Sequence, residues 1–142
     1  MTPDHTPPEL NEMSGSALAY LGDAVLEIMV RAMLVRTGIG NSGRLNELSR
    51  DYVRATVQSA GMERLLPFLS EEEEAVYRRG RNAAGAHPKS ETVAEYRRAT
   101  GLEALFGYLY LKNDQKRLDE LFALYIEQKN DTDCSTENGI NK

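Results

Sequence analysis

The chain has 142 residues, of which 41% are hydrophobic and 27% are charged, and its formal net charge is −5. These values are typical of one globular domain with its own core, and they exclude two catalytic domains or a catalytic domain with a full accessory module. The only cysteine, Cys134, cannot form an internal disulfide, and no apolar run approaches the roughly 18 residues that span a bilayer. Because the N-terminus also lacks a signal peptide, we expect a cytoplasmic protein that does not contact a membrane.

The two ends of the chain differ in composition from its middle. Residues 1–13 are polar and rich in proline, and residues 129–142 contain almost no apolar side chains. We therefore expect a flexible N-terminal segment, one folded domain over 14–128 and a disordered polar tail. The only histidines are His5 and His87, and neither is near the cysteine, which excludes a Cys/His zinc site.

Helical periodicity begins early in the predicted domain. We expect a first helix from a cap at Ser14 or Ser16 to about Arg36, ended by Gly38 and Gly40. Its apolar residues have the spacing of one buried face: Leu18, Leu21, Val25, Ile28, Ala32 and Val35. A second helix is expected after Ser42, over about 43–60, with Gly61 as its end.

Capping signals mark the helices that follow. A short helix is expected to break near Pro67, and Ser70 with Glu73 forms a capping box that starts the next helix. The acidic run 71–74 complements the dipole of that helix, which explains the run without a metal ion. Thr92 and Glu95 form a second box before a helix over 93–111, and a last helix is expected over 115–128. No segment shows the alternation of a strand, so the predicted fold class is all-α.

Two acidic residues lie on the helix faces opposite the apolar stripes. Asp23 lies nearly opposite the apolar stripe of the first helix, and Glu103 has the same position on the helix over 93–111. Gly22, Gly101 and Gly107 interrupt these helices, and small residues allow helix backbones to approach closely. Converging carboxylates without histidine or cysteine favour Mg²⁺ or Mn²⁺. The alternative is that Asp23 is a surface residue paired with a neighbouring arginine.

A basic segment follows the acidic run. Residues 78–98 carry a net charge of +4, while the rest of the chain carries −9. Its first part contains the candidate phosphate-binding residues, namely Arg78, Arg79, Arg81, Asn82 and Lys89. The alternative is a solvated helix end, where basic side chains complement the dipole.

These motifs carry a family resemblance. The run Ala19-Tyr20-Leu21-Gly22-Asp23-Ala24-Val25-Leu26-Glu27 resembles the signature helix of the ribonuclease III family, and 100–109 resembles its second acidic helix. With the segment 71–83, and with no double-stranded-RNA-binding domain expected after residue 128, the chain most closely resembles the Mini-ribonuclease III subfamily. The resemblance covers about 16–128.

The resemblance implies a homodimeric, all-α ribonuclease III-type endonuclease domain that cleaves double-stranded RNA with Mg²⁺ or Mn²⁺. Asp23 and Glu103 match the catalytic and metal-binding acids, and Tyr20, Glu27 and Thr100 are expected around them. The expected substrate is precursor 23S ribosomal RNA, trimmed at both ends, and a ribosomal protein bound to the precursor is a further expected partner. Full-length members carry additional acids where this chain has Ser16, Ala19 and Thr100, so fewer protein ligands are expected at the metal.

Two other functions are compatible with parts of this pattern. A non-catalytic helical RNA-binding factor for ribosome assembly would use the same basic segment, but the retained Asp23 and Glu103 oppose it. An all-α nucleotide pyrophosphohydrolase would use the acidic run 71–74, which already has a role at the capped start of a helix. We therefore expect a metal-dependent endoribonuclease.

Overall fold

The computed structural model describes residues 9–86 and 92–126, and all regular structure in these ranges is helical. The order of the elements is η1 (Leu10–Glu12), α1 (Gly15–Val35), α2 (Ser42–Val53), α3 (Ala55–Leu65), η2 (Leu66–Phe68), α4 (Glu71–Ala83), α5 (Val93–Leu111) and a last helical segment over 115–126. This confirms the all-α fold class. Among the described helices, none is long and apolar enough to cross a membrane.

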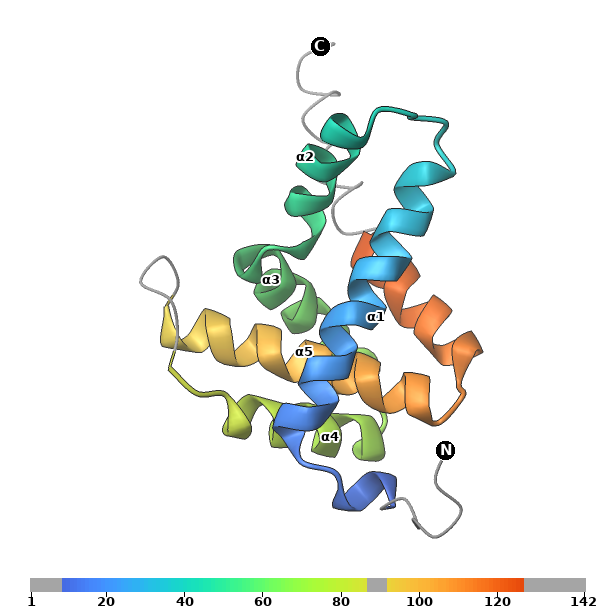
Figure 1. Ribbon diagram of the computed structural model, residues 1–142. Coiled ribbons are helices and arrows are strands. Elements are labelled where there is room, and N and C mark those ends of the chain that lie inside the picture. Colours follow the sequence, from blue (N-terminus) through green and yellow to red (C-terminus); the bar gives the residue numbers. More distant parts are fainter. Residues whose placement is uncertain (1–8, 87–91, 127–142) are drawn as a thin grey trace, which may run out of the picture.

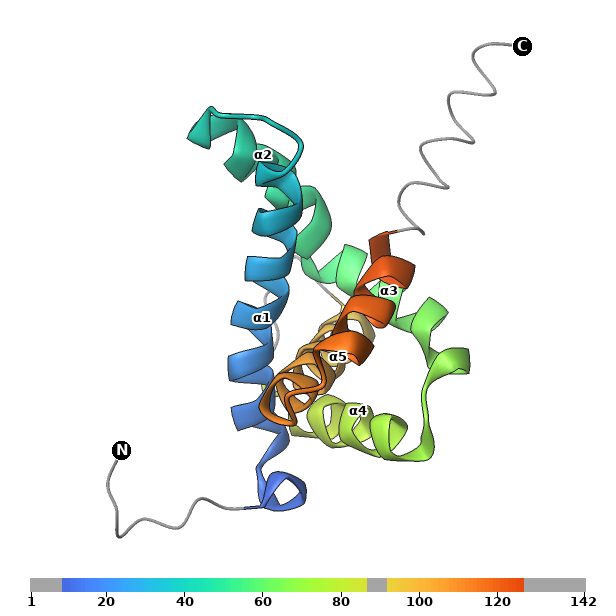
Figure 2. The same cartoon turned by 90° about the vertical axis from the view of Figure 1, so that its right-hand side faces the viewer.

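Helix α5 is the centre of the fold. Helix α1 crosses it closely, and α4 and α3 pack against it from other sides (Figure 1). Viewed nearly along α5, helix α1 lies on one side while α3 and α4 lie on the other (Figure 2). The middle of α5 is therefore buried, with Leu102, Leu105 and Phe106 fully inaccessible to solvent. A helix surrounded in this way holds its side chains in fixed positions.

The helix caps predicted at Ser14, Ser70 and Thr92 are confirmed, whereas α2 is capped by Asn41 and already includes Ser42. The Ser14 hydroxyl accepts a hydrogen bond from the Ala17 amide at 3.0 Å. Capping boxes with both reciprocal hydrogen bonds start α4 at Ser70 and α5 at Thr92. Gly38 follows α1 with a φ of 95°, a conformation that side chains disfavour. Local hydrogen bonding thus sets where these helices begin and end.

The single helix expected over 43–60 is wrong, because Arg54 separates α2 from α3. This residue is extended, with φ −66° and ψ 151°, and its carbonyl accepts the first hydrogen bond of α3 from the Gln58 amide. Gly61 lies inside α3 instead of ending it. A β-carbon there would lie 2.5 Å from the Tyr125 ring, so the glycine provides space for the helical segment 115–126.

The apolar stripe expected on α1 is wrong at two positions. Ile28 is 67% exposed and Val35 is 58% exposed, whereas Leu18 and Val25 are buried as expected. The reason is that α5 crosses α1 at Gly22, so the buried face turns toward Leu26, Val30 and Leu34. The outward face of α1 consequently carries exposed apolar side chains.

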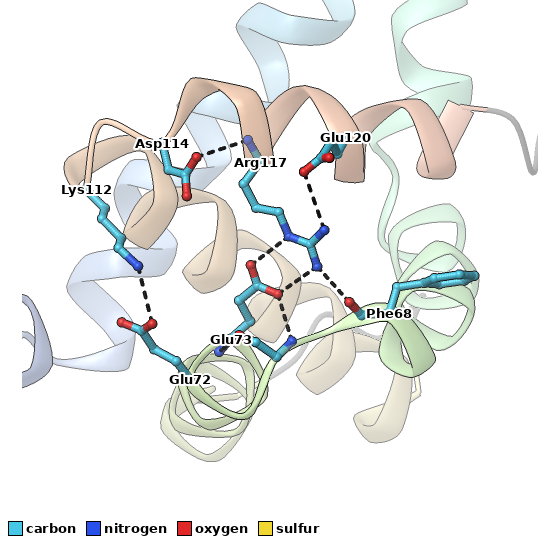
Figure 3. Close-up of polar contacts among 8 residues, drawn as sticks. Phe68, Glu72, Glu73, Lys112, Asp114, Arg117 and Glu120 are labelled. Carbon is cyan, nitrogen blue, oxygen red and sulfur yellow. Dashed lines mark hydrogen bonds and ion pairs between the residues drawn. The ribbon is translucent and has the colours of Figure 1, made fainter.

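The acidic start of α4 is used in structural contacts (Figure 3). Glu73 accepts hydrogen bonds from Arg117 at 2.8 and 2.9 Å, and the same guanidinium donates to the Phe68 carbonyl at 2.7 Å. Burial alone would raise the pKa of Glu73, but the hydrogen bonds from Arg117 and Ser70 outweigh burial and lower it. These contacts hold the helical segment 115–126 against α4.

Candidate active site

The two candidate acids come from helices that touch at glycines. A β-carbon on Gly22 would lie 1.5 Å from the Glu103 carbonyl oxygen, and one on Gly107 would lie 2.1 Å from the Leu18 carbonyl oxygen. Only glycine permits these approaches, because every other residue would place an atom on the opposing backbone. The expectation that the glycines allow close helix contact is confirmed.

At the crossing, Asp23 and Glu103 belong to the turns of α1 and α5 whose backbones are in contact. Asp23 directly follows Gly22 and is exposed, whereas Glu103 belongs to the turn of α5 on which Gly22 packs and is half-buried. Burial, and after it the negative charge of Glu103, raise the pKa of the Tyr125 hydroxyl above its ordinary value. The Glu103 carboxylate therefore lies near Tyr125, whose hydroxyl donates to the Tyr52 carbonyl. One acid faces solvent, and the other borders a buried phenol.

This donor set fits a hard divalent cation with few protein ligands. Among the described residues, no group of three or more histidine, cysteine, aspartate or glutamate side chains could hold a metal. The positions of Ser16 and Ala19 add no carboxylate, and Ala19 is buried. A cation at the crossing would therefore use Asp23 and Glu103 and would keep several water ligands, as Mg²⁺ commonly does.

The residues expected around the acids have different surroundings. Tyr20 is 86% exposed, and Glu27 accepts a hydrogen bond at 2.9 Å from Arg31 on the next turn of α1. The Thr100 hydroxyl donates at 2.8 Å to the Tyr96 carbonyl within α5. Their expected roles beside the metal remain predictions.

The candidate phosphate-binding residues divide into two groups. Arg79 donates to the Asn11 and Leu10 carbonyls at 2.6 and 3.3 Å, so it anchors η1 to α4 and serves the structure. Arg78 is exposed, with only a 3.8 Å ion pair to Glu74, and Arg81 lies over the Tyr77 ring at 5.6 Å.

Asn82 and Lys89 complete the set of candidate phosphate-binding residues. Asn82 is exposed at the end of α4, where its side chain accepts a 3.4 Å hydrogen bond from Arg81. Lys89 lies outside the described residues. Three described side chains of this set therefore remain available to RNA, at the surface or in a neighbouring groove: Arg78, Arg81 and Asn82.

The phosphate-binding residues chosen from the sequence did not include two further arginines that lie beside them in the fold. Arg97 and Arg98, from α5, line a groove of about 570 Å³ together with Arg78 and Arg81 from α4. The charge count over 78–98 includes all four arginines. Spacing alone could not show that two helices bring them to one groove.

Comparisons with known proteins find similarity to one family. Residues 16–114 match the family described as Ribonuclease III domain. The chain is similar to a Mini-ribonuclease 3 from Symbiobacterium thermophilum, with 49% identity over 78% of this chain and 88% of the relative. It is also similar to those from Desulfitobacterium hafniense, with 46% identity over 79% and 71%, and Enterococcus faecalis, with 40% identity over 87% and 96%. A crystal structure of a Fusobacterium nucleatum protein superposes with a TM-score of 0.78 at 31% identity, over 87% of this chain and 99% of that one.

Proposed function

This chain belongs to the ribonuclease III family and is an endoribonuclease, and we propose that it hydrolyses double-stranded RNA where α1 crosses α5. The observation that carries this proposal is the packing of Gly22 on the Glu103 backbone. This packing joins the turns of α1 and α5 that carry Asp23 and Glu103, two acids 80 positions apart in the sequence, and it supports a site shared by both. A phosphodiester backbone can reach such a site, because Asp23 is exposed.

A divalent cation, Mg²⁺ or alternatively Mn²⁺, would be held by Asp23 and Glu103. When bound, it would lower the pKa of a water and neutralise charge that develops on the phosphate. The chain contributes rigidity, because Gly22 and Gly107 lock the two helices in close contact. It also contributes a partly buried environment at Glu103, which strengthens the electrostatic interactions of that carboxylate.

RNA binding outside the cut site falls to the basic segment. Arg78, Arg81 and Asn82 offer guanidinium and amide groups for backbone phosphates and sugars of the RNA that flanks the cut. Lys89 belongs to the same proposal through its charge. Because phosphate contacts release counterions, binding should weaken steeply as salt is added.

The outward face of α1 supports a homodimer as part of this proposal. Tyr20 and Ile28 are 86% and 67% exposed and lie two turns apart on this face, and Tyr110 of α5 adds an exposed aromatic ring. Large exposed apolar side chains gathered on one helix are typical of a protein interface. Two-fold pairing through α1 would give two sites, which suits the two strands of a duplex.

The natural substrate that we propose is precursor 23S ribosomal RNA in the cytoplasm, trimmed at both ends. This part of the proposal depends on the resemblance to the Mini-ribonuclease III subfamily. A ribosomal protein bound to the precursor would then hold the RNA in the cleavable shape. The retained Asp23 and Glu103 oppose a purely structural role in ribosome assembly.

The metal requirement provides the test of this function. The protein is incubated with a long RNA duplex, with Mg²⁺, with Mn²⁺ or after chelation of divalent ions, and the product ends are determined. We expect cleavage with either metal, 5′-phosphate and 3′-hydroxyl ends, and no cleavage after chelation. Cleavage that continues at the same rate in the chelator would contradict the proposed chemistry.

A further inference from the structure

The arginine groove faces away from the two acids. Its wall on α5 includes Ala94 and Arg97, and its other walls come from α3, η2 and α4. Ala94 and Glu103 are nine positions apart, which at about 3.6 residues per turn places them on opposite sides of α5. Figure 2 shows α1 on one side of α5 and the helices α3 and α4 on the other. RNA held in this groove therefore lies outside the segment that is placed against Asp23 and Glu103.

The charges of the groove are only partly neutralised. Arg98 pairs with Glu63 at 3.2 Å and donates to the Ser59 hydroxyl at 2.8 Å, and Arg78 is 3.8 Å from Glu74. Within the described ranges, neither Arg81 nor Arg97 forms an ion pair with a carboxylate. Four arginines against two glutamates leave a groove suited to phosphates.

An exposed aromatic ring lies close in sequence to the groove. Leu66 of η2 lines it, and two residues further on Phe68 exposes 58% of its surface. The ring points away from the Arg117 contacts that hold its own backbone (Figure 3). Exposed aromatic rings beside basic grooves bind unpaired nucleotides by stacking, which a base-paired segment does not permit.

We propose that this groove binds the single-stranded RNA that flanks the cleaved duplex, with Arg97 and Arg81 on its phosphates and Phe68 against a base. The inference rests on the proposed function, which supplies the RNA. It adds a recognition site for the unpaired part of the substrate on the far side of α5. An enzyme with this site prefers a duplex with a tail to the same duplex with blunt ends.

The test compares a short blunt duplex with the same duplex carrying a single-stranded tail of about ten nucleotides. Binding is measured in an Asp23→Asn background so that the RNA stays intact. We expect the tailed RNA to bind about tenfold more tightly, and Arg97→Ala and Phe68→Ala each to remove most of that preference. Arg97→Ala should also reduce the salt slope for the tailed RNA by about 0.7, the value for one phosphate contact on a single strand.

Arg44→Ala is the matched control, because Arg44 is an exposed arginine on α2 with a 3.5 Å ion pair to Glu47. It should leave the preference for the tail unchanged. The inference is wrong if the tail adds no affinity, if Arg97→Ala weakens both RNAs equally, or if an acidic peptide but no RNA tail occupies the groove. Cleavage of the blunt duplex by the wild-type enzyme tests the proposed function separately, and Arg97→Ala should not change its rate.

Discussion

At the scale of single residues, glycine determines the site more directly than any charged side chain. Gly22 and Gly107 lack the atoms that would separate α1 from α5, and the turns that carry Asp23 and Glu103 are in contact for that reason. The sequence supports this conclusion, because mid-helix glycine is costly and needs a compensating contact. What the sequence could not provide is the partner atom, the Glu103 carbonyl, because that contact joins residues far apart in the chain.

The first prediction concerns Gly22→Ala. A β-carbon 1.5 Å from the Glu103 carbonyl oxygen forces backbone to move, so we expect the free energy of unfolding to fall by about 3 kcal/mol. Denaturant unfolding measures this change. Gly40→Ala is the control, since nothing lies within 4 Å of a β-carbon there, and it should change stability by less than about 1 kcal/mol. Equal stability of the two variants would mean that the helices do not touch at Gly22.

At the scale of the elements, the helices α4 and 115–126 are joined by charge. Glu73 has a lowered pKa because the hydrogen bonds from Arg117 and Ser70 outweigh its burial. A carboxyl whose pKa is lowered by folding stabilises the fold above its ordinary pKa of 4.5, and this stabilisation is lost as the pH falls through the folded-state value. Acid should therefore loosen this junction.

The second prediction follows from this loss of stability at low pH. Glu73→Gln should lower the free energy of unfolding at neutral pH by about 1–2 kcal/mol, because a charged hydrogen-bond acceptor is replaced by a neutral one. It should also lose less stability than the wild type between about pH 6 and about pH 3. Urea unfolding at several pH values measures both effects. Parallel pH profiles for the two proteins would show that Glu73 is not charged in the junction.

The elements also show where sequence patterns are informative. Caps at Ser14, Ser70 and Thr92 depend on hydrogen bonds within one turn, so the sequence predicts them well. The break at Arg54 has no glycine or proline signal, and it exists because α2 packs on α1 while α3 packs on α5. Likewise, the sequence alone indicates a helix end at Gly61, whereas in the fold this glycine lies inside α3 and makes room for the Tyr125 ring.

At the scale of the whole molecule, the charge of the chain is divided among faces. The arginines gather where α4 and the start of α5 meet, and the acids at the crossing lie on the other side of α5. A third face, the outer side of α1, exposes Tyr20, Ile28 and Val35. The amphipathic pattern of α1 predicts one buried face, and it cannot show that a second apolar face remains for a partner.

The third prediction tests this apolar face. Ile28→Glu places a charge in the proposed interface, so the protein should sediment as a monomer while the wild type sediments as a dimer. Phe68→Glu is the matched control, because Phe68 is similarly exposed, at 58%, but follows α3. A monomeric wild type, or a dimer that survives Ile28→Glu, would exclude pairing through this part of α1.

In the proposed function, the acids at the α1–α5 crossing perform the cleavage. Its most direct measurement is the single-turnover rate of duplex RNA cleavage with Mg²⁺ for the wild type, Asp23→Asn and Asp51→Asn. Asp51 is an aspartate of α2 with 50% side-chain exposure, paired with Arg54 at the end of that helix. We expect Asp23→Asn to be slower by about a hundredfold or more, because a metal ligand stabilises the transition state by several kcal/mol, and Asp51→Asn to match the wild type. Equal rates for the wild type and Asp23→Asn would contradict the account.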